Sequence, residues 1–318
     1  MTDYKNHPAY RQAAELLVSR DDFAILCHVN PDGDTLGSAY GLAGMLEKLG
    51  KRVCVHCGST PEPKFDYLRE GLALACTQPQ TVVSVDVATP ELLGGLREVF
   101  PKVDLLFDHH GSGTEFAPIV VRDADASSAT VVMLRMCELL GVEPDTQIAD
   151  ALFTGLTTDT GCFRYSNVTA EAHRAAIRLI EAGARTALIN RWMFETKSRA
   201  EMDFTRLALD TLEYVCDGKV ALLYVTDEMR RKSGFYSTEL GEIPQFPRRV
   251  EGVVCGITVK QVENEVFKVS LRTNSELDAT VLAGRFGGGG HVRAAGCTLR
   301  GSLKEVRERL IAAAQELV

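Results

Sequence analysis

Residues 103–110 read Val-Asp-Leu-Leu-Phe-Asp-His-His, a short apolar run that ends in the acid Asp108 and the imidazoles His109 and His110. An acid and two imidazoles at the tip of a buried strand are costly to place for packing alone, because polar groups lose hydration on burial. The same groups are ordinary ligands of divalent metals and can contact phosphate. This stretch therefore predicts a strand whose carboxyl end carries chemistry.

Two other apolar runs end in the same way. Phe-Ala-Ile-Leu-Cys at 23–27 leads into His28 and Asn-Pro-Asp-Gly-Asp at 30–34, and Thr-Val-Val-Ser-Val at 81–85 leads into Asp86. Continuous apolar runs between helical segments are typical of parallel strands, and open parallel sheets bind ligands at the carboxyl ends of their strands. A single acid after a strand is usually a turn or helix-cap residue. Three coincident clusters that contain both His and Asp instead predict one convergent site.

The remaining patterns divide the chain into two domains. Strand and helix patterns alternate in the first part, which predicts a doubly wound parallel sheet. Besides the three strands, we expect a strand at 52–57 and helices at 36–49, 91–99, 127–140, 145–156 and 170–182. The boundaries are expected at 1–190 for this α/β domain, 191–214 for a helical linker, and 215–318 for a smaller α+β domain. The second domain holds a glycine run, Gly-Gly-Gly-Gly-His at 287–291, and a closing helix at 303–317.

Length and charge restrict the classes of protein. A chain of 318 residues is long enough for two domains. Its formal net charge of −8 argues against binding long nucleic acid through the backbone, which draws on many Lys and Arg contacts. No apolar stretch approaches the roughly 18 residues of a membrane span, and residues 1–10 lack the apolar segment of a signal peptide. We therefore expect a cytoplasmic protein with no membrane partner.

The nine cysteines are expected to be reduced, because their number is odd and most lie in apolar segments. Cys54 and Cys57 form a Cys-x-x-Cys pair, but a zinc site needs a second pair of ligands at a suitable spacing. The alternation within residues 53–57 favours a plain strand instead.

Five motifs occur in order along the chain. They are His-Val-Asn-Pro-Asp-Gly-Asp-Thr-Leu-Gly-Ser at 28–38, Asp86, Asp-His-His at 108–110, Thr-Asp-Thr-Gly-Cys-Phe-Arg-Tyr-Ser-Asn at 158–167, and Gly-Gly-Gly-Gly-His-Val-Arg-Ala-Ala-Gly at 287–296. Each motif is weak by itself, but the ordered set resembles the DHH phosphoesterase family with the associated C-terminal domain that carries a Gly-Gly-Gly-His signature. The resemblance covers essentially the whole chain. The size and the two domains look most like the nanoRNase/pAp-phosphatase group of bifunctional oligoribonucleases and pAp phosphatases.

The resemblance implies a site for two Mn²⁺ ions, with Mg²⁺ or Co²⁺ as substitutes, in a cleft between the domains. It assigns one ion to His28, Asp32 and Asp86. It assigns the other ion to Asp34, Asp86, His109 and Asp159, so that Asp86 bridges the pair. We expect Gly33 to provide a turn that lets the flanking acids point at different metals.

Further residues are assigned to catalysis and to the substrate. Asp108 is expected to orient a metal-bound imidazole, and His110 to lie beside the scissile phosphate. The resemblance assigns the substrate to residues of the second domain, Arg272, Gly288, Gly289, Gly290 and His291. The glycines are expected to offer backbone N–H groups to an anion. Ser127 and Ser128 are expected to cap a helix rather than to bind phosphate.

The implied activity is Mn²⁺-dependent hydrolysis of short oligoribonucleotides and linear dinucleotides to 5′-mononucleotides, together with removal of the 3′-phosphate of adenosine 3′,5′-bisphosphate. Two alternatives remain open at this point: a phosphodiesterase of cyclic dinucleotides such as cyclic di-AMP, and a non-catalytic sensor that binds metal and nucleotide. Long duplex nucleic acid is not an expected partner. A homodimer is suggested by the resemblance alone.

Overall fold

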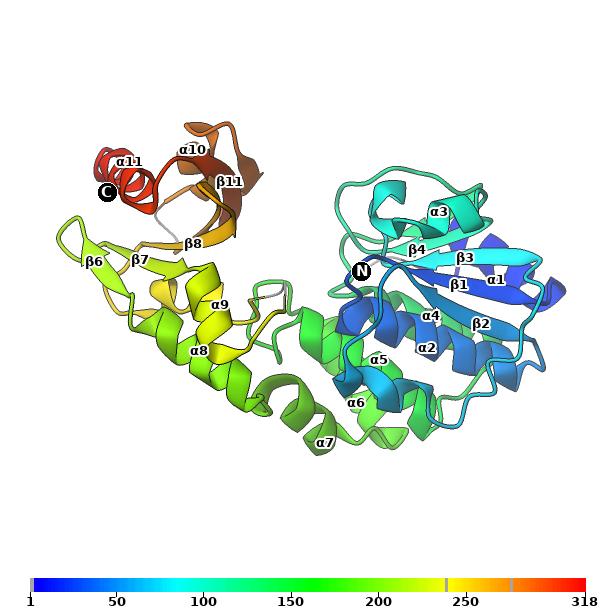
Figure 1. The fold of residues 1–318 in the computed structure, drawn as a ribbon. Helices are drawn as coiled ribbons and strands as arrows, with labels where there is room; N and C mark the ends of the chain where they lie inside the picture. The colour runs from blue at the N-terminus through cyan, green and yellow to red at the C-terminus, as the bar shows by residue number, and fades with distance from the viewer. Residues whose placement is uncertain (1–2, 238–239, 275–276) are drawn as a thin grey trace. The chain divides into compact units, whose positions relative to one another are not determined.

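The computed structural model describes residues 3–237, 240–274 and 277–318 (Figure 1). The chain forms two compact units, Met1–Thr196 and Lys197–Val318, each with its own hydrophobic core. No helix in the described part of the chain is long and apolar enough to cross a membrane. All nine cysteines are free thiols, as predicted.

The first unit is built on a five-stranded parallel sheet with the order β2-β1-β3-β4-β5. Its strands are β1 (Phe23–Cys27), β2 (Val53–Cys57), β3 (Thr81–Val85), β4 (Leu105–Asp108) and β5 (Ile119–Arg122). The four predicted strands are confirmed. The sequence missed β5, because three apolar residues followed by an arginine are too short a pattern to distinguish from a loop.

The two faces of this sheet lie against different cores, because successive side chains of a strand point in opposite directions. Phe23 and Ile25 point into a large core under helices, whereas Ala24 and Leu26 point into a smaller core under short turns. The large core is covered by α1 (Pro8–Ser19), α2 (Gly33–Lys48), α4 (Ala129–Leu140), α5 (Thr146–Asp159) and α6 (Ala170–Glu181). The smaller core lies under η2 (Pro90–Leu93) and α3 (Leu96–Val99), on the other side of the sheet (Figure 1). The predicted doubly wound α/β fold is confirmed.

One predicted helix is broken in the structure. The pattern at 91–99 predicted a single helix, but Gly94 has a φ of +55° and separates η2 from α3. A left-handed glycine at this position ends a helical segment. The remaining helical elements of the unit are η1 (Pro63–Arg69), α7 (Thr186–Asn190) and the π-helical turn η3 (Arg191–Glu195).

Glycines on one side of α2 let this helix pack directly against α5. A Cβ atom at Gly37 would lie 2.4 Å from the carbonyl oxygen of Ala151, and one at Gly33 would lie 2.3 Å from Oγ1 of Thr158. A methyl group does not fit at such distances, so the two helices approach more closely than side chains would allow. The close approach brings the first turn of α2 against the last turn of α5.

The second unit contains a six-stranded mixed sheet with the order β10-β11-β9-β8-β7-β6. Its strands are β6 (Glu213–Val215), β7 (Val220–Val225), β8 (Cys255–Glu263), β9 (Val266–Thr273), β10 (Gly289–His291) and β11 (Ala294–Arg300). Only β7 and β8 are parallel among the neighbouring pairs of the described strands. The predicted smaller α+β domain is therefore confirmed.

Helices cover both sides of this second sheet unequally. One face packs against α10 (Ala279–Gly284) and α11 (Leu303–Gln315). The other face is covered by α8 (Arg199–Leu209), α9 (Asp227–Ser233) and the turns η4 (Ile243–Gln245) and η5 (Pro247–Arg249). Residues of α8, α9 and η4 form a small core with β7, and η4 and η5 contact β8. The same face of β9 and β11 carries partly exposed or exposed polar residues, among them Lys268 and Thr298.

The segment 191–214, predicted to be a helical linker, is divided between the two units. The turn Arg191–Glu195 belongs to the first unit, and α8 belongs to the second. Phe204 of α8 is fully buried in the small core beside β7. Most of this segment is therefore an integral part of the second unit, a role that its mixed polar and apolar pattern did not reveal.

We expect Gly37→Ala to destabilise the first unit by about 1–3 kcal/mol, the usual cost of overpacking, because the new methyl group meets the backbone of α5. Gly95→Ala is the matched control in the same unit, since its Cβ meets nothing within 4 Å and its φ of −63° suits alanine. Thermal and urea unfolding of both variants would measure the difference. Equal stabilities for the two variants would contradict the close packing of α2 on α5.

Candidate active site

The candidate site lies where the strand order of the first sheet reverses. The chain passes from β1 to β2 on one side and returns to β3 on the other. At such a reversal a crevice forms outside the carboxyl ends of the strands, and ligands bind there. His28 follows β1, Asp86 follows β3, and Asp108 is the last residue of β4. The three clusters that the sequence singled out therefore lie at one edge of the sheet.

His28, Asp32 and Asp86 form the first group of possible metal ligands, with ligand atoms within 4.8 Å of one another. Nε2 of His28 lies 3.8 Å from Oδ1 of Asp32 and 3.7 Å from Oδ2 of Asp86, too far for hydrogen bonds. Nδ1 of His28 is 2.8 Å from the carbonyl oxygen of Val29. A carbonyl oxygen only accepts, so Nδ1 donates and Nε2 faces the carboxylates.

Asp34, His109 and Asp159 form the second group. Nε2 of His109 lies 3.6 Å from Oδ2 of Asp34 and 3.6 Å from Oδ2 of Asp159. It also lies 3.6 Å from Oδ1 of Asp86. Nδ1 of His109 faces the carbonyl oxygen of Ala126 at 3.3 Å, so Nε2 is again the ligand atom of the ring. The packing of α2 on α5 accounts for the meeting of Asp34 with Asp159.

Asp86 stands between the two groups. Its Oδ2 faces His28 and its Oδ1 faces His109. The residue is only 3% exposed, and Oδ1 has no hydrogen-bond partner among the described residues. A buried carboxylate oxygen without a partner is costly, and a cation beside it would remove that cost. The residues therefore fit a carboxylate that bridges two metal ions.

The electrostatics of the cluster also fit bound cations. Burial, followed by the charge of Asp34, raises the pKa of Asp86 well above its usual range. Burial and the charges of Asp34 and Asp86 raise the pKa of Asp159 to about 9. Burial lowers the pKa of His28, but the carboxylates of Asp32 and Asp86 outweigh it and raise this pKa to about 10. In the metal-free protein at pH 7, bound protons therefore offset the negative charge of the cluster. Hard divalent ions such as Mn²⁺ suit its mixed oxygen and nitrogen donors.

Two helix N-termini hold acids of the cluster in place. Oδ1 of Asp32 accepts hydrogen bonds of 3.0 Å from the backbone N–H groups of Asp34 and Thr35, and thereby caps α2. Oδ2 and Oδ1 of Asp34 accept from the N–H groups of Ala129 and Thr130 at the start of α4, at 2.6 and 3.0 Å. Helix N-termini stabilise negative charge, so both carboxylates are anchored where they face the imidazoles.

Three small residues near the cluster have structural roles. Gly33 has no positive φ, so the turn geometry predicted for it is wrong; it is glycine because α5 presses on it at Thr158. Ser128 caps α4, as predicted. Ser127 instead donates a hydrogen bond of 2.8 Å to the carbonyl oxygen of Asn167.

Asp108 contacts His110 rather than the ring of His109. It is fully buried, and its Oδ1 accepts from Nδ1 of His110 at 2.7 Å and from the backbone N–H of His109 at 2.9 Å. This hydrogen bond raises the pKa of His110, although burial opposes the shift. The side chain of His110 is 46% exposed, so the ring is oriented at one nitrogen and accessible elsewhere. Asp108 thus orients His110, the imidazole that the sequence assigned to the phosphate and that also lies in a third group of possible metal ligands with Asp86 and His109.

Arg122, at the end of β5, supports this pair, and its role was not predicted from the sequence. Its Nε donates to Oδ2 of Asp108 at 2.8 Å, and its terminal nitrogens lie 3.4 and 3.2 Å from the carbonyl oxygens of Gly113 and Thr114. Burial would raise the pKa of Asp108, but the hydrogen bonds from His110 and Arg122 hold it below its usual range. The contact follows from the pairing of β5 with β4, which places Arg122 opposite Asp108, and could be predicted only if β5 were predicted as a strand.

In the second unit, Arg272 and His291 lie in one row of the sheet. Arg272 of β9 is paired with Ala294 of β11, which is paired with His291 of β10. Directly paired residues point to the same face of a sheet. Two of the predicted substrate residues therefore flank the small side chain of Ala294.

The glycine run is more regular than the sequence suggested. The N–H groups of Gly287 and Gly288 donate to carbonyl oxygens at the end of α10, so the expectation that the run offers its N–H groups to an anion is wrong for Gly288. Gly289 and Gly290 form β10 together with His291. β10 is an edge strand, and the outward backbone groups of an edge strand have no partner within the sheet.

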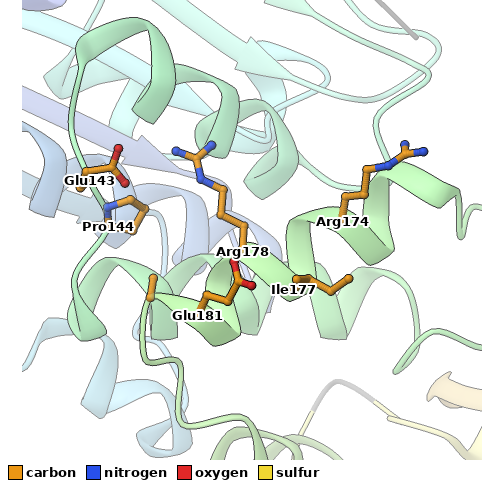
Figure 2. Close-up of a pocket in the computed structure, with 7 residues that line it drawn as sticks. Glu143, Pro144, Arg174, Ile177, Arg178 and Glu181 are labelled. Carbon is orange, nitrogen blue, oxygen red and sulfur yellow. The ribbon is translucent and has the colours of Figure 1, made fainter.

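A separate pocket of about 660 Å³ lies on the first unit beside α6 (Figure 2). Figure 2 shows Arg174 and Arg178 on this helix, with Glu143 and Glu181 also lining the pocket. The two positive charges of the arginines are balanced by the two negative charges of the glutamates, so the pocket has no net charge. None of the residues of the metal-ligand cluster lines this pocket, and we assign no function to it.

A parallel α/β sheet with a His–Asp cluster at its carboxyl edge, joined in one chain to an α+β unit, defines a phosphoesterase of the DHH class. The DHH family N-terminal domain matches residues 22–156, and the DHHA1 domain matches residues 217–318. The chain belongs to the DHH family, as the five motifs predicted.

The chain is similar to bifunctional oligoribonucleases and PAP phosphatases. It is 32% identical to NrnA of Thermus thermophilus, over 92% of this chain and 89% of that protein, and 22% identical to NrnA of Bacillus subtilis, over 86% and 87%. An exopolyphosphatase-related protein from Bacteroides fragilis has the same fold, with a TM-score of 0.85, 22% identity and coverage of 98% and 97% of the two chains. RecJ of Thermus thermophilus, solved with Mn²⁺, has a TM-score of 0.58 at 18% identity, over 98% of this chain and 55% of RecJ.

We expect Arg122→Ala to lower kcat by about 100-fold, the scale of a misplaced acid or base, because Asp108 would no longer hold His110. Metal affinity should be unchanged, since Arg122 contacts no residue of the two metal-ligand groups. Arg122→Lys should recover part of the activity, because one ammonium can replace only one of the contacts. Metal titration and kinetics would separate the two effects, and a variant that lost metal affinity as strongly as kcat would contradict a positioning role.

Metal binding at pH 7 should release protons from the cluster. Asp159 and His28, with pKa values of about 9 and about 10, hold protons in the metal-free protein below those pH values. Bound cations displace these protons, so the release should be large at pH 7 and should vanish above pH 10. Calorimetry in buffers of different ionisation enthalpy measures the release, and a binding enthalpy independent of the buffer at pH 7 would contradict the account.

Proposed function

We propose that the protein is a Mn²⁺-dependent phosphodiesterase that hydrolyses short oligoribonucleotides and linear dinucleotides to 5′-mononucleotides. We propose in addition that it removes the 3′-phosphate of adenosine 3′,5′-bisphosphate. The similarity to proteins named bifunctional oligoribonuclease and PAP phosphatase supports both activities. The cytoplasmic location and the homodimer expected from the sequence stay predictions.

The observation that carries the proposal is the placement of Asp86. One buried carboxylate directs its two oxygens at two imidazoles, each of which faces further acids. Metal ions held by His28, Asp32 and Asp86 on one side, and by Asp34, Asp86, His109 and Asp159 on the other, would lower the pKa of a bound water and neutralise a phosphate. Such an arrangement suits hydrolysis of a phosphoester without a nucleophile from the protein.

The residues around the ligand groups would act on the phosphate itself. His110 is held by Asp108 at Nδ1, and its pKa is raised, so near neutral pH the ring carries more positive charge than an isolated imidazole. A cationic imidazole beside the scissile phosphate would stabilise the charge that develops during hydrolysis, and could donate a proton to the leaving oxygen.

Residues of the second unit would hold the part of the substrate that is not cleaved. Arg272 and His291 flank Ala294 on one face of the sheet, which leaves room for a phosphate or a ribose above the small side chain. The assignment of Gly288, Gly289 and Gly290 to the substrate stays a prediction. The net charge of −8 supports small substrates over long polymers, because extended backbone binding requires many cationic contacts.

The proposal is tested by product analysis of the purified protein with Mn²⁺, using a linear diribonucleotide, adenosine 3′,5′-bisphosphate, cyclic di-AMP and a long single-stranded RNA. We expect rapid hydrolysis of the dinucleotide and the bisphosphate, and slow hydrolysis of the long RNA. A preference for cyclic di-AMP would contradict the proposed substrate. Absence of turnover with several divalent metals would indicate a sensor.

Asp86→Asn should abolish turnover of every substrate, with a loss beyond the ~100-fold typical of groups that only support metal ligands. Asp66→Asn is the matched control, because Asp66 is exposed and pairs only with Arg69 among the ion pairs of the described residues. The control should retain wild-type activity. Substantial activity in a folded Asp86→Asn variant would contradict the central role of this carboxylate.

A further inference from the structure

The sheet of the second unit continues beyond Arg272 as a polar surface. Successive outward residues of β9 are Arg272, Ser270 and Lys268, whereas Val269 and Leu271 between them are buried. Gly296 of β11 is paired with Ser270, and Thr298 with Lys268. Because paired residues share a face, two further rows of small or polar residues lie beside the row of Arg272 and His291.

These two rows form one wall of a pocket of about 440 Å³, within the roughly 300–1,000 Å³ of small-ligand sites. It is lined by Lys268, Val269, Ser270, Phe286, Gly287, Gly288, Gly296, Cys297 and Thr298. None of these residues is acidic, and Lys268 makes no ion pair with any residue in the described ranges. A pocket with an ammonium, two hydroxyl groups and no carboxylate, in a protein of net charge −8, favours an anionic ligand.

Glycines keep the floor of the pocket open. A Cβ atom at Gly288 would lie 2.1 Å from the carbonyl oxygen of Gly296, so the turn after α10 rests directly on β11. Gly296 itself adds no side chain above the sheet. Phe286 is the one aromatic residue of the lining, but its ring packs against the core under α10 and α11, with the guanidinium of Arg309 5.6 Å from its centroid. The pocket thus offers a backbone surface at its glycines, two hydroxyl groups and a cationic end at Lys268.

The spacing of the rows suits a nucleotide chain. Outward residues on one strand are about 7 Å apart, close to the separation of successive phosphates along an extended single strand. A ligand held at Arg272 and His291 can therefore present its next phosphate between the row of Ser270 and the row of Lys268.

We propose that this pocket binds an additional nucleotide of a single-stranded oligoribonucleotide, adjacent to the nucleotide held by Arg272 and His291. The inference rests on the proposed function and extends it to chain length. Lys268 binds the phosphodiester, and Ser270 and Thr298 donate hydrogen bonds to phosphate or ribose oxygens. The pocket is filled by a trinucleotide and left empty by a dinucleotide.

The test compares Lys268→Ala with Lys304→Ala, using a linear dinucleotide and a trinucleotide as substrates. Lys304 is the matched control, because it is an exposed lysine of α11 that does not line the pocket. Lys268→Ala should lower kcat/KM for the trinucleotide by about tenfold, equivalent to a contact of ~1.4 kcal/mol, mainly through KM. Its dinucleotide kinetics should stay within about twofold of wild type, less than ~0.5 kcal/mol.

Two further measurements separate a contact from a change in folding. The slope of log KM against log salt for the trinucleotide should become shallower by ~0.7 in Lys268→Ala, the value for one lost phosphate contact with a single strand. Thr298→Val, which keeps the volume and removes the hydroxyl, should weaken the trinucleotide alone. Both variants should unfold at the wild-type temperature.

The outcomes distinguish this proposal from the proposed function. Wild-type protein that hydrolyses neither oligonucleotide would contradict the proposed function, and the additional subsite with it. Wild-type activity on both substrates, with equal losses or no losses in Lys268→Ala, would contradict the subsite alone. An equal effect of Lys304→Ala on the trinucleotide would show a general charge effect and would also contradict the subsite.

Discussion

Repulsion among the carboxylates that face His28 and His109 is the constraint on which this structure depends. Asp34 and Asp86 are buried, and the charge of each disfavours ionisation of its neighbours. Burial strengthens that repulsion, because little water screens the charges. Only protons or cations can neutralise the cluster, and Oδ1 of Asp86 has no hydrogen-bond partner in the described part of the chain. The fold therefore maintains a site that is electrostatically incomplete without positive charge.

The architecture supplies the geometry that this cluster needs. The reversal of strand order places the ends of β1 and β3 side by side, and with them His28 and Asp86. The glycine-lined contact between α2 and α5 brings Asp34 to Asp159, and the N-terminus of α4 fixes the carboxylate of Asp34. Each of these features is local, but their combination joins residues from distant parts of the sequence in one site.

The sequence predicted this site better than its surroundings. Short apolar runs followed by His or Asp can be recognised in the sequence itself. The fold class and the convergence of the three clusters could therefore be predicted from the sequence alone. The hydrogen bond from Arg122 to Asp108 could not be inferred from the sequence, because it depends on a strand of only four residues beside β4. The role of Gly33 was misjudged for a similar reason, since its constraint comes from α5 and not from its own turn. The N–H groups of the glycine run were expected to be free because a sequence does not show the carbonyl oxygens at the end of α10.

In the proposed function, the two units would divide the work on a small nucleotide: the metal-ligand groups and His110 of the first unit would act on the phosphate, and the polar sheet face of the second unit would hold the rest. We propose that Asp86 would bridge two bound ions, and electron paramagnetic resonance during a Mn²⁺ titration tests this most directly. We expect two ions for each chain with an exchange-coupled spectrum, because ions that share a carboxylate lie about 3.5–4 Å apart. A single bound ion at saturation, or two ions with uncoupled spectra, would contradict it.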